Sequence, residues 1–154
     1  MYEKDVKTTF PPTNHLIVGL IGALTLFGAS LSAAPLPLVS VTASPSTVDP
    51  EIQQPAQYTI SLSAPASRDI GVVFYMSGTA RLGVDYFLSG NFNGSGQIVI
   101  PAGQTFTTVT LTPRAGDTHA VRENALMNLV HDTRSVHTYA LGFPFRADVI
   151  ITIE

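Results

Sequence analysis

The sequence contains no cysteine, and its lysines end at Lys7. Without cysteine, no disulfide can brace the fold and no thiolate can bind a metal. Without lysine beyond Lys7, a Lys–Asn isopeptide cross-link cannot form within residues 8–154. Only 12% of the residues are charged, the formal net charge is −3, and the arginines are scattered from Arg68 to Arg146. Nucleic-acid binding needs a basic surface that neutralises phosphates, so the composition excludes that class of function.

One long apolar stretch lies near the N-terminus, where residues 16–34 form an uncharged run. Lys4 and Lys7 precede this run, and small residues close it at residues 29–34. The order basic, apolar, small is that of a secretory signal peptide. The run is also long enough to span a bilayer, so a retained signal anchor is the alternative. In both cases the lysines favour a cytoplasmic N-terminus and an exported remainder, either secreted or held at the cell surface.

After a short linker at residues 35–37, the sequence alternates with a period of two. Such alternation places every second side chain on the same face of a β-strand. The alternating positions are Val39 and Val41; Tyr58, Ile60 and Leu62; Ile98 and Ile100; Thr107, Val109 and Leu111; Ala125, Met127 and Leu129; and Val149, Ile151 and Ile153. A nearly continuous apolar run over residues 70–76 indicates a central strand that is covered on both faces.

About seven such strands, separated by Gly, Pro, Asn, Asp or Ser, predict an all-β fold, an Ig-like antiparallel β-sandwich. We assign residues 1–34 to the signal peptide or signal anchor, residues 35–37 to the linker and residues 38–154 to the sandwich domain. A domain of about 120 residues is large enough for a two-sheet core that folds without disulfides. The longest irregular stretch, residues 132–146, is expected to form a loop before the last strand.

The most specific motif follows the apolar run and reads Gly-Thr-Ala-Arg-Leu-Gly-Val-Asp-Tyr over residues 78–86. Gly83 can supply the positive φ of a tight turn. Asp85 then lies at the junction of loop and strand, where its carboxylate either accepts backbone N–H groups or meets a cation. Tyr86 can bury its ring and keep its hydroxyl in water. Two interpretations stay open for the motif: a structural clasp within the loop, or one part of a calcium site.

This motif resembles the G-T-A-x-x-G-x-D-Y signature of Calx-beta domains. Three other segments are similar to that family in the same order: residues 39–62 to its opening strands, 98–104 to its T-I-P-A-G-Q turn, and 123–129 to its E-T-V-T-L-T-L strand. The resemblance covers residues 38–154. It implies a β-sandwich module of the kind that occurs as a unit in larger adhesion, matrix or exchanger proteins.

The resemblance also implies a candidate calcium site. Calcium-binding members of the family gather carboxylates at one end of the sandwich, because calcium takes about six to eight oxygen ligands. The resemblance places Glu51, Asp85 and Glu123 at three of these positions, with Asp49 or Asp117 as stand-ins for missing ligands. The family's paired aspartates and its terminal aspartate cluster have no counterpart here, so the expected calcium binding is weak.

The sequence predicts a protein that is not an enzyme. His119, His131 and His137 lie in or beside the loops around the 125–129 strand, without the spacing of a metal-binding or catalytic motif. A hydrolase that uses these histidines is therefore the weakest hypothesis. The leading hypothesis is a structural or adhesive surface module that self-assembles through a β-edge or its N-terminal segment, and the alternative is a calcium-responsive binding module. The expected partner is a protein or a second copy, with membrane contact only through residues 16–34 if these are retained.

Overall fold

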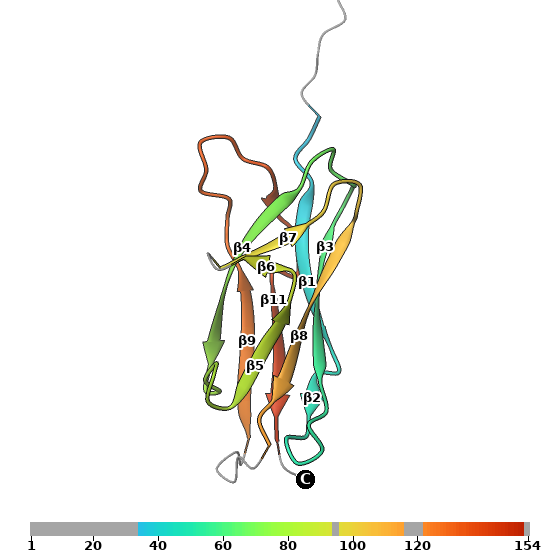
Figure 1. Cartoon of the computed structure of the whole chain (residues 1–154). Coiled ribbons are helices and arrows are strands. Elements are labelled where there is room, and N and C mark those ends of the chain that lie inside the picture. The colour runs from blue at the N-terminus through green and yellow to red at the C-terminus, as the bar shows by residue number, and fades with distance from the viewer. Residues whose placement is uncertain (1–33, 94–95, 116–121, 153–154) are drawn as a thin grey trace, which may run out of the picture. The chain divides into compact units, whose positions relative to one another are not determined.

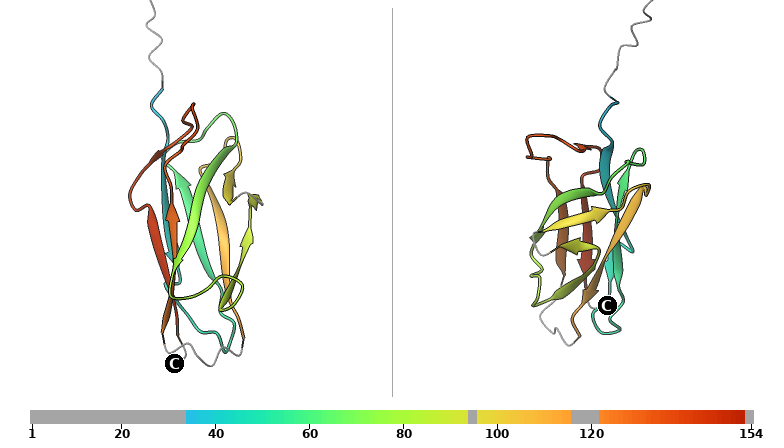
Figure 2. Two further views of the ribbon diagram at one scale, coloured as in Figure 1. Left: turned by 90° about the vertical axis from the view of Figure 1, so that its left-hand side faces the viewer. Right: turned by 45° about the horizontal axis from the view of Figure 1, so that its top comes forward.

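The computed structural model describes residues 34–93, 96–115 and 122–152. In this part of the chain every regular element is a β-strand, and the strands form two sheets that pack face to face (Figures 1 and 2). The five-stranded sheet has the order β10-β1-β3-β8-β5, and the six-stranded sheet has the order β2-β11-β9-β4-β7-β6. The prediction of an all-β sandwich is confirmed.

The strands differ widely in length, from nine residues in β4 to two in β2, β6 and β10. In chain order they are β1 (Leu38–Ser44), β2 (Thr47–Val48), β3 (Ala56–Leu62), β4 (Ile70–Gly78), β5 (Tyr86–Gly90), β6 (Phe92–Asn93), β7 (Gln97–Ile100), β8 (Phe106–Pro113), β9 (Glu123–Leu129), β10 (Ala140–Leu141) and β11 (Arg146–Ile151). All the long strands pair antiparallel with their neighbours.

The hydrophobic core lies between the two sheets, and period-two alternation builds it. In β3 and β11 every second side chain is buried, while the residues between them are exposed or half-buried. The buried members of these two strands are Ala56, Tyr58, Ile60, Leu62, Ala147, Val149 and Ile151. The alternating positions predicted for the other strands are buried as well, except for Thr107, which is half-buried, and Ile153, which lies outside the described residues.

The chain divides into two units, residues 1–33 and residues 34–154, and every described residue belongs to the second. That unit contains both sheets and the whole described core, so it can fold independently of the preceding residues. Within the described part, no helix is long and apolar enough to cross a membrane. The apolar run of residues 16–34 lies outside the described residues except for Ala34, so its predicted role in export stays a prediction.

The structure corrects the expected strand inventory in two ways. Strand β5 was not predicted, because consecutive apolar residues at Tyr86, Phe87 and Leu88 hide the alternation. The short strands β2 and β10 pair parallel with β11 and β1, so the sheets are mixed rather than purely antiparallel. These two-residue pairings form where the chain passes a sheet edge, which sequence periodicity cannot show.

Strand β4 lies inside the six-stranded sheet, as the apolar run predicted, but it is not covered on both faces. Tyr75 is 52% exposed, although its neighbours Phe74 and Met76 pack against the core. The first half of β4 pairs with β7 and the second half pairs with β9. A strand whose pairing partner changes halfway leaves part of one edge open.

The loop before β11 is held by a buried carboxylate. Asp132 is 4% exposed, and its side chain accepts hydrogen bonds from the side chains and backbone N–H groups of Arg134 and Thr138. The Arg134 Nε atom lies 2.7 Å from the Asp132 Oδ1 atom, and Arg134 also donates to the Gly71 carbonyl oxygen of β4. The expected irregular segment is therefore an ordered loop, and it contains the short strand β10.

Candidate functional site

The carboxylates predicted to bind calcium lie at one end of the sandwich, the lower end in Figure 1. Ile151 of β11 pairs with Val48 of β2 on one side and with Glu123 of β9 on the other. Because neighbouring strands are about 4.8 Å apart, the backbones of Val48 and Glu123 are separated by roughly 10 Å. The β2–β3 loop, which carries Asp49 and Glu51, therefore begins close to the start of β9.

The β2–β3 loop is shaped by the first of its two acidic residues. The Oδ1 atom of Asp49 accepts a hydrogen bond from the backbone N–H of Glu51 at 2.8 Å. The backbone carbonyl oxygen of Asp49 accepts the N–H of Gln54 at 3.1 Å. Asp49 is thus a turn residue that is half-buried, whereas Glu51 is exposed. Of the two, Glu51 has the side chain that solvent and ions can reach.

Asp85 forms the clasp that one interpretation of the motif predicted. It is 8% exposed, and its Oδ2 atom accepts the backbone N–H of Arg81 at 2.6 Å. The backbone N–H of Asp85 donates to the Arg81 carbonyl oxygen at 2.9 Å, and the Asp85 carbonyl oxygen accepts the N–H of Arg114. Between Arg81 and Asp85, Gly83 has a φ of 84°, the positive value expected for it. The clasp therefore closes the β4–β5 loop and joins it to the end of β8.

The first half of the same motif fixes this loop to β9. Thr79 exchanges hydrogen bonds with Asn124: its hydroxyl accepts the Asn124 backbone N–H at 3.0 Å, and its backbone N–H donates to Asn124 Oδ1 at 3.1 Å. Ala80 is buried and donates its N–H to the Asn124 carbonyl oxygen. Gly78, with a φ of 115°, approaches that same oxygen so closely that a Cβ atom would overlap it. Each small residue of the motif thus has a packing role next to Glu123.

Tyr86 differs from the expectation in one respect. The whole residue is 1% exposed, so its hydroxyl is buried with the ring instead of reaching water. Burial, with the negative charge of Asp85 as a second cause, raises the pKa of Tyr86 to about 12. Tyr86 therefore packs as a core residue at the start of β5.

The described residues do not complete a metal site by themselves. Among residues 34–93, 96–115 and 122–152, no group of three or more Asp, Glu or His side chains is close enough to hold a metal ion. Glu51, Asp85 and half-buried Glu123 reach the same end of the sandwich from three different segments. Asp117, the other predicted stand-in, lies outside the described residues. The donor chemistry fits calcium, but its convergence on one ion stays a prediction.

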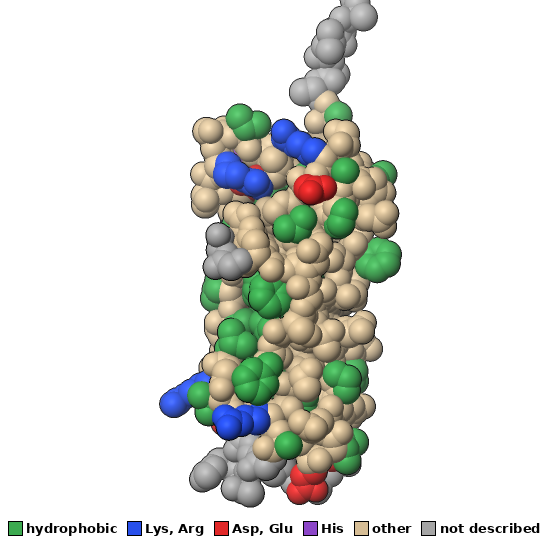
Figure 3. Space-filling model, viewed as in Figure 1, with side chains coloured by type: hydrophobic (Ala, Val, Ile, Leu, Met, Phe, Trp, Pro, Cys, Tyr) green, Lys and Arg blue, Asp and Glu red, His purple; other side chains and the backbone are tan. Residues whose placement is uncertain are grey.

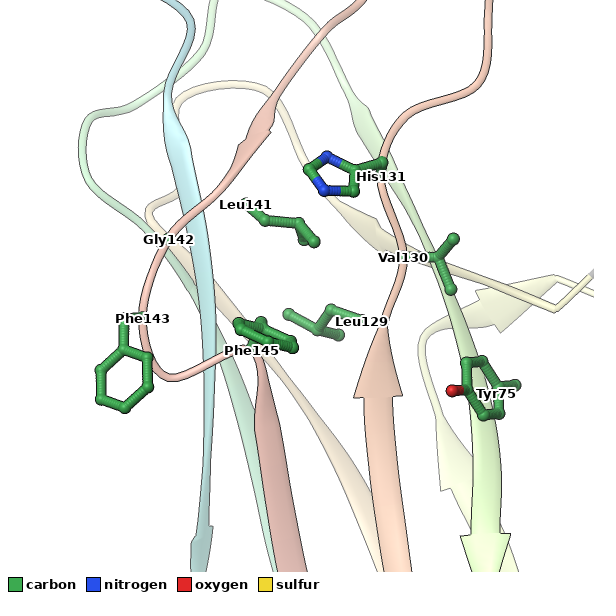
Figure 4. Close-up of a pocket in the computed structure, with 8 residues that line it drawn as sticks. All are labelled: Tyr75, Leu129, Val130, His131, Leu141, Gly142, Phe143 and Phe145. Carbon is green, nitrogen blue, oxygen red and sulfur yellow. The ribbon is translucent and has the colours of Figure 1, made fainter.

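An apolar depression that sequence reasoning missed lies at the end of β9. It has a volume of about 610 Å³, and Leu129, Leu141, Phe145 and His131 turn toward it (Figure 4). Phe143 points away from the depression in the same view and is 89% exposed. The Phe-Pro-Phe sequence in a predicted loop was the available sign of such a surface. His131 is exposed and makes no hydrogen bond to another described side chain, so it has no catalytic partner in this part of the chain.

No protein-family model and no curated relative matches the chain. The fold is similar to three solved structures. CBD12 from CALX1.2 aligns with a TM-score of 0.55 and 17% identity over 76% of this chain, and the apo-form Calx CBD1 domain with 0.54 and 17% over 76%. CBD12 of CALX1.1, described as a calcium binding domain, aligns with 0.53 and 18% over 74%.

The likeness to these structures concerns the fold. The chain spans 44% of each CBD12 chain and 98% of the CBD1 domain. The predicted Calx-beta-like sandwich is therefore confirmed as a fold, and it corresponds to nearly the full length of a single CBD1 domain. Membership of the family still rests on the sequence motif of residues 78–86.

Proposed function

We propose that this β-sandwich is a non-enzymatic, exported binding module whose acidic end takes up calcium weakly. One observation carries the proposal: the acidic segments at residues 49–51, 85 and 123 occupy the same end of the sandwich. The likeness of the fold to that of a protein described as a calcium binding domain supports it. Export rests on the apolar run of residues 16–34 and is part of the same proposal.

The chemistry of the acidic end suits calcium better than a transition metal. Carboxylate oxygens are hard ligands, and calcium tolerates irregular sets of them. Glu51 and Glu123 would supply oxygens, with Asp49 or Asp117 beside them, while Asp85 keeps the β4–β5 loop closed. Bound calcium would neutralise the gathered negative charge. So few carboxylates place the expected dissociation constant at about 10⁻⁴ to 10⁻³ M, the range of extracellular modules.

The test is a thermal melt of residues 34–154 in excess EDTA and in about 10 mM calcium, a concentration above the expected dissociation constant. Binding to the native state at a hundred times the dissociation constant stabilises by about 2.7 kcal/mol, which raises the midpoint by roughly 10 °C. The double variant Glu51→Gln, Glu123→Gln should lose this rise. Asp69→Asn is the matched control, because Asp69 precedes β4 at the opposite end of the sandwich and should keep it.

The competing candidate is a passive structural or adhesive module. Coincident melts in EDTA and calcium would favour it and would contradict calcium binding. An equal rise with magnesium would also count against the proposal, since it would indicate nonspecific screening of the acidic end. The specific observation in favour of a structural module is an open apolar groove on one side of the sandwich.

A further inference from the structure

One side of the sandwich leaves two strand edges open. Within the described part, β5 pairs with β8 and with no strand on its other side. The second half of β4 pairs with β9, again on one side. Between these two edges lies a groove of about 680 Å³, here called the β4–β5 groove. Its apolar lining includes Phe74, Met76, Leu82, Phe87, Leu88 and Phe92.

The backbone of β4 presents hydrogen-bonding groups to this groove. The carbonyl oxygen of Val73 accepts the N–H of Val130 on the β9 side, whereas the N–H of Phe74 donates to Gly96 on the opposite side. Successive residues of a strand alternate in this direction. The N–H and C=O of Met76 therefore face the groove, where no described strand pairs with them. Such an edge is a template for an added strand.

The side chains around the groove are those of an incomplete core. Phe74, Met76 and Leu88 pack against the core but are only partly buried. At the rim, Leu82 is 53% and Phe87 51% exposed. Hydrophobic side chains gather over β5 and β6 on this face (Figure 3). A contiguous apolar surface of this kind is typical of an interaction site, since isolated monomers rarely leave one uncovered.

The other sheet edges in the described part end in two-residue strands. These are β10 beside β1, β2 beside β11, and β6 beside β7. Very short edge strands are one way in which proteins prevent edge-to-edge association. Only the groove side combines longer open edges with apolar side chains, so it is the side that fits an added strand.

We propose that the β4–β5 groove binds residues 16–33 of a second copy of the chain as an added β-strand. The chain itself carries the required segment, because this run has no charge and places Leu16, Val18 and Leu20 on one strand face. A few of its residues suffice, since five extended residues cover about 17 Å. The segment leads into β1, which β3 and β8 separate from β5 in the sheet, so a neighbouring copy is the donor.

The test uses residues 34–154 and a fluorescent peptide of residues 16–33 with lysines added at its ends for solubility. Binding is followed by fluorescence anisotropy in EDTA, which separates it from the calcium proposal. Met76→Pro should weaken binding at least tenfold, because proline removes the groove-facing N–H without removing a bond to β9. Met76→Leu keeps that N–H and should bind within twofold of the native unit.

A second variant guards against misfolding at Met76. Phe87→Lys places a charge at the groove rim and should also weaken binding at least tenfold. Phe106→Lys is its matched control, because Phe106 has a similar exposed fraction, 55%, but lies at the start of β8 and does not line the groove. Equal losses in both lysine variants would show nonspecific apolar adsorption and would overturn the proposal.

The full chain supplies the last readout. In sedimentation it should form oligomers that Phe87→Lys dissociates and Phe106→Lys does not. A monomeric full chain, or a peptide that fails to bind residues 34–154, would overturn the proposal. So would removal of residues 16–33 from the mature protein, as shown by its mass, because the donor segment would then be absent.

Discussion

The hydroxyl of Tyr58 donates a 2.6 Å hydrogen bond to the backbone carbonyl oxygen of Ala125. Tyr58 belongs to β3 of the five-stranded sheet and Ala125 to β9 of the six-stranded sheet, so the bond crosses the core. Both residues are completely buried. Burial raises the pKa of Tyr58 far above its ordinary value, so the hydroxyl keeps its proton and remains a donor. The bond therefore fixes the position of one sheet relative to the other.

Replacing Tyr58 by phenylalanine should lower the free energy of unfolding by about 1–2 kcal/mol, because the buried Ala125 oxygen loses a partner. For a unit of this size the melting midpoint should fall by roughly 5 °C. Tyr75→Phe removes the same hydroxyl from a side chain that is 52% exposed, and its midpoint should stay unchanged. Equal effects in the two variants would show that the bond between the sheets contributes nothing.

Asp132 should make the stability depend on pH in the acid range. The Arg134 guanidinium and the hydrogen bonds from Thr138 hold the pKa of Asp132 well below its ordinary value of 3.8. A carboxyl group with a lower pKa in the folded state stabilises the fold above its unfolded pKa, and this contribution is lost as the pH falls. The stabilisation from Asp132 is therefore complete at neutral pH and declines as the pH drops below about 4.

The corresponding variant is Asp132→Asn, which keeps the shape but removes the charge. Urea unfolding at pH 7 should give a free energy lower by about 1–3 kcal/mol, since a buried, charge-assisted network is broken. The difference from the native protein should shrink between pH 4 and pH 2, in the direction set by the lowered pKa. Asp69→Asn, at an exposed carboxylate, should show no such pH-dependent difference. A constant difference across this range would contradict the assignment.

Gly78 and Gly83 separate backbone strain from steric overlap. Both have positive φ, 115° and 84°, but an added Cβ at Gly78 would overlap the Asn124 carbonyl oxygen, whereas nothing lies within 4 Å at Gly83. Gly83→Ala should therefore cost about 1 kcal/mol, from the φ alone. Gly78→Ala should cost clearly more, because the β4–β5 loop must also move away from β9. Chemical denaturation of both variants measures the difference, and similar costs would disprove the close approach.

Asp85 should act on stability even without calcium. In EDTA, Asp85→Ala should lower the unfolding free energy by about 1–2 kcal/mol, since the buried Arg81 N–H loses its acceptor. Asp85→Asn keeps an acceptor oxygen and should lose less. Thermal melts of both variants in EDTA make the comparison. If neither changes the midpoint, Asp85 does not act as a clasp, and its predicted place among the calcium ligands becomes the stronger interpretation.

The fold was accessible from the sequence wherever a strand has one buried face. Alternation located β3 and β8, because their side chains divide cleanly between core and solvent. It missed β5, where Phe87 is exposed between buried Tyr86 and half-buried Leu88, so that apolar residues occupy both faces. That failure coincides with the open groove. A strand that is apolar on both faces conceals its period and exposes hydrophobic surface for the same reason.

The candidate calcium ligands came from a resemblance to a known family, and the structure accounts for part of that motif. It shows why glycine stands at position 78 and how Asp85 closes the loop through Arg81. These roles were foreseen as one of two alternatives, because a turn aspartate bonds to local backbone in most settings. The contact between Thr79 and Asn124 was not foreseen, since the two residues are 45 positions apart.

The sequence by itself determined the β class, the buried positions and the turn at Gly83, because periodicity and φ preference are local properties of the chain. Only the tertiary structure decided that Glu51 and Glu123 share one end of the sandwich and that β4 and β5 leave their edges open beside each other. Strand order depends on pairings between distant segments, as when Ile151 joins Val48 and Glu123. Such pairings are settled when the two sheets close over a common core, which no local pattern specifies.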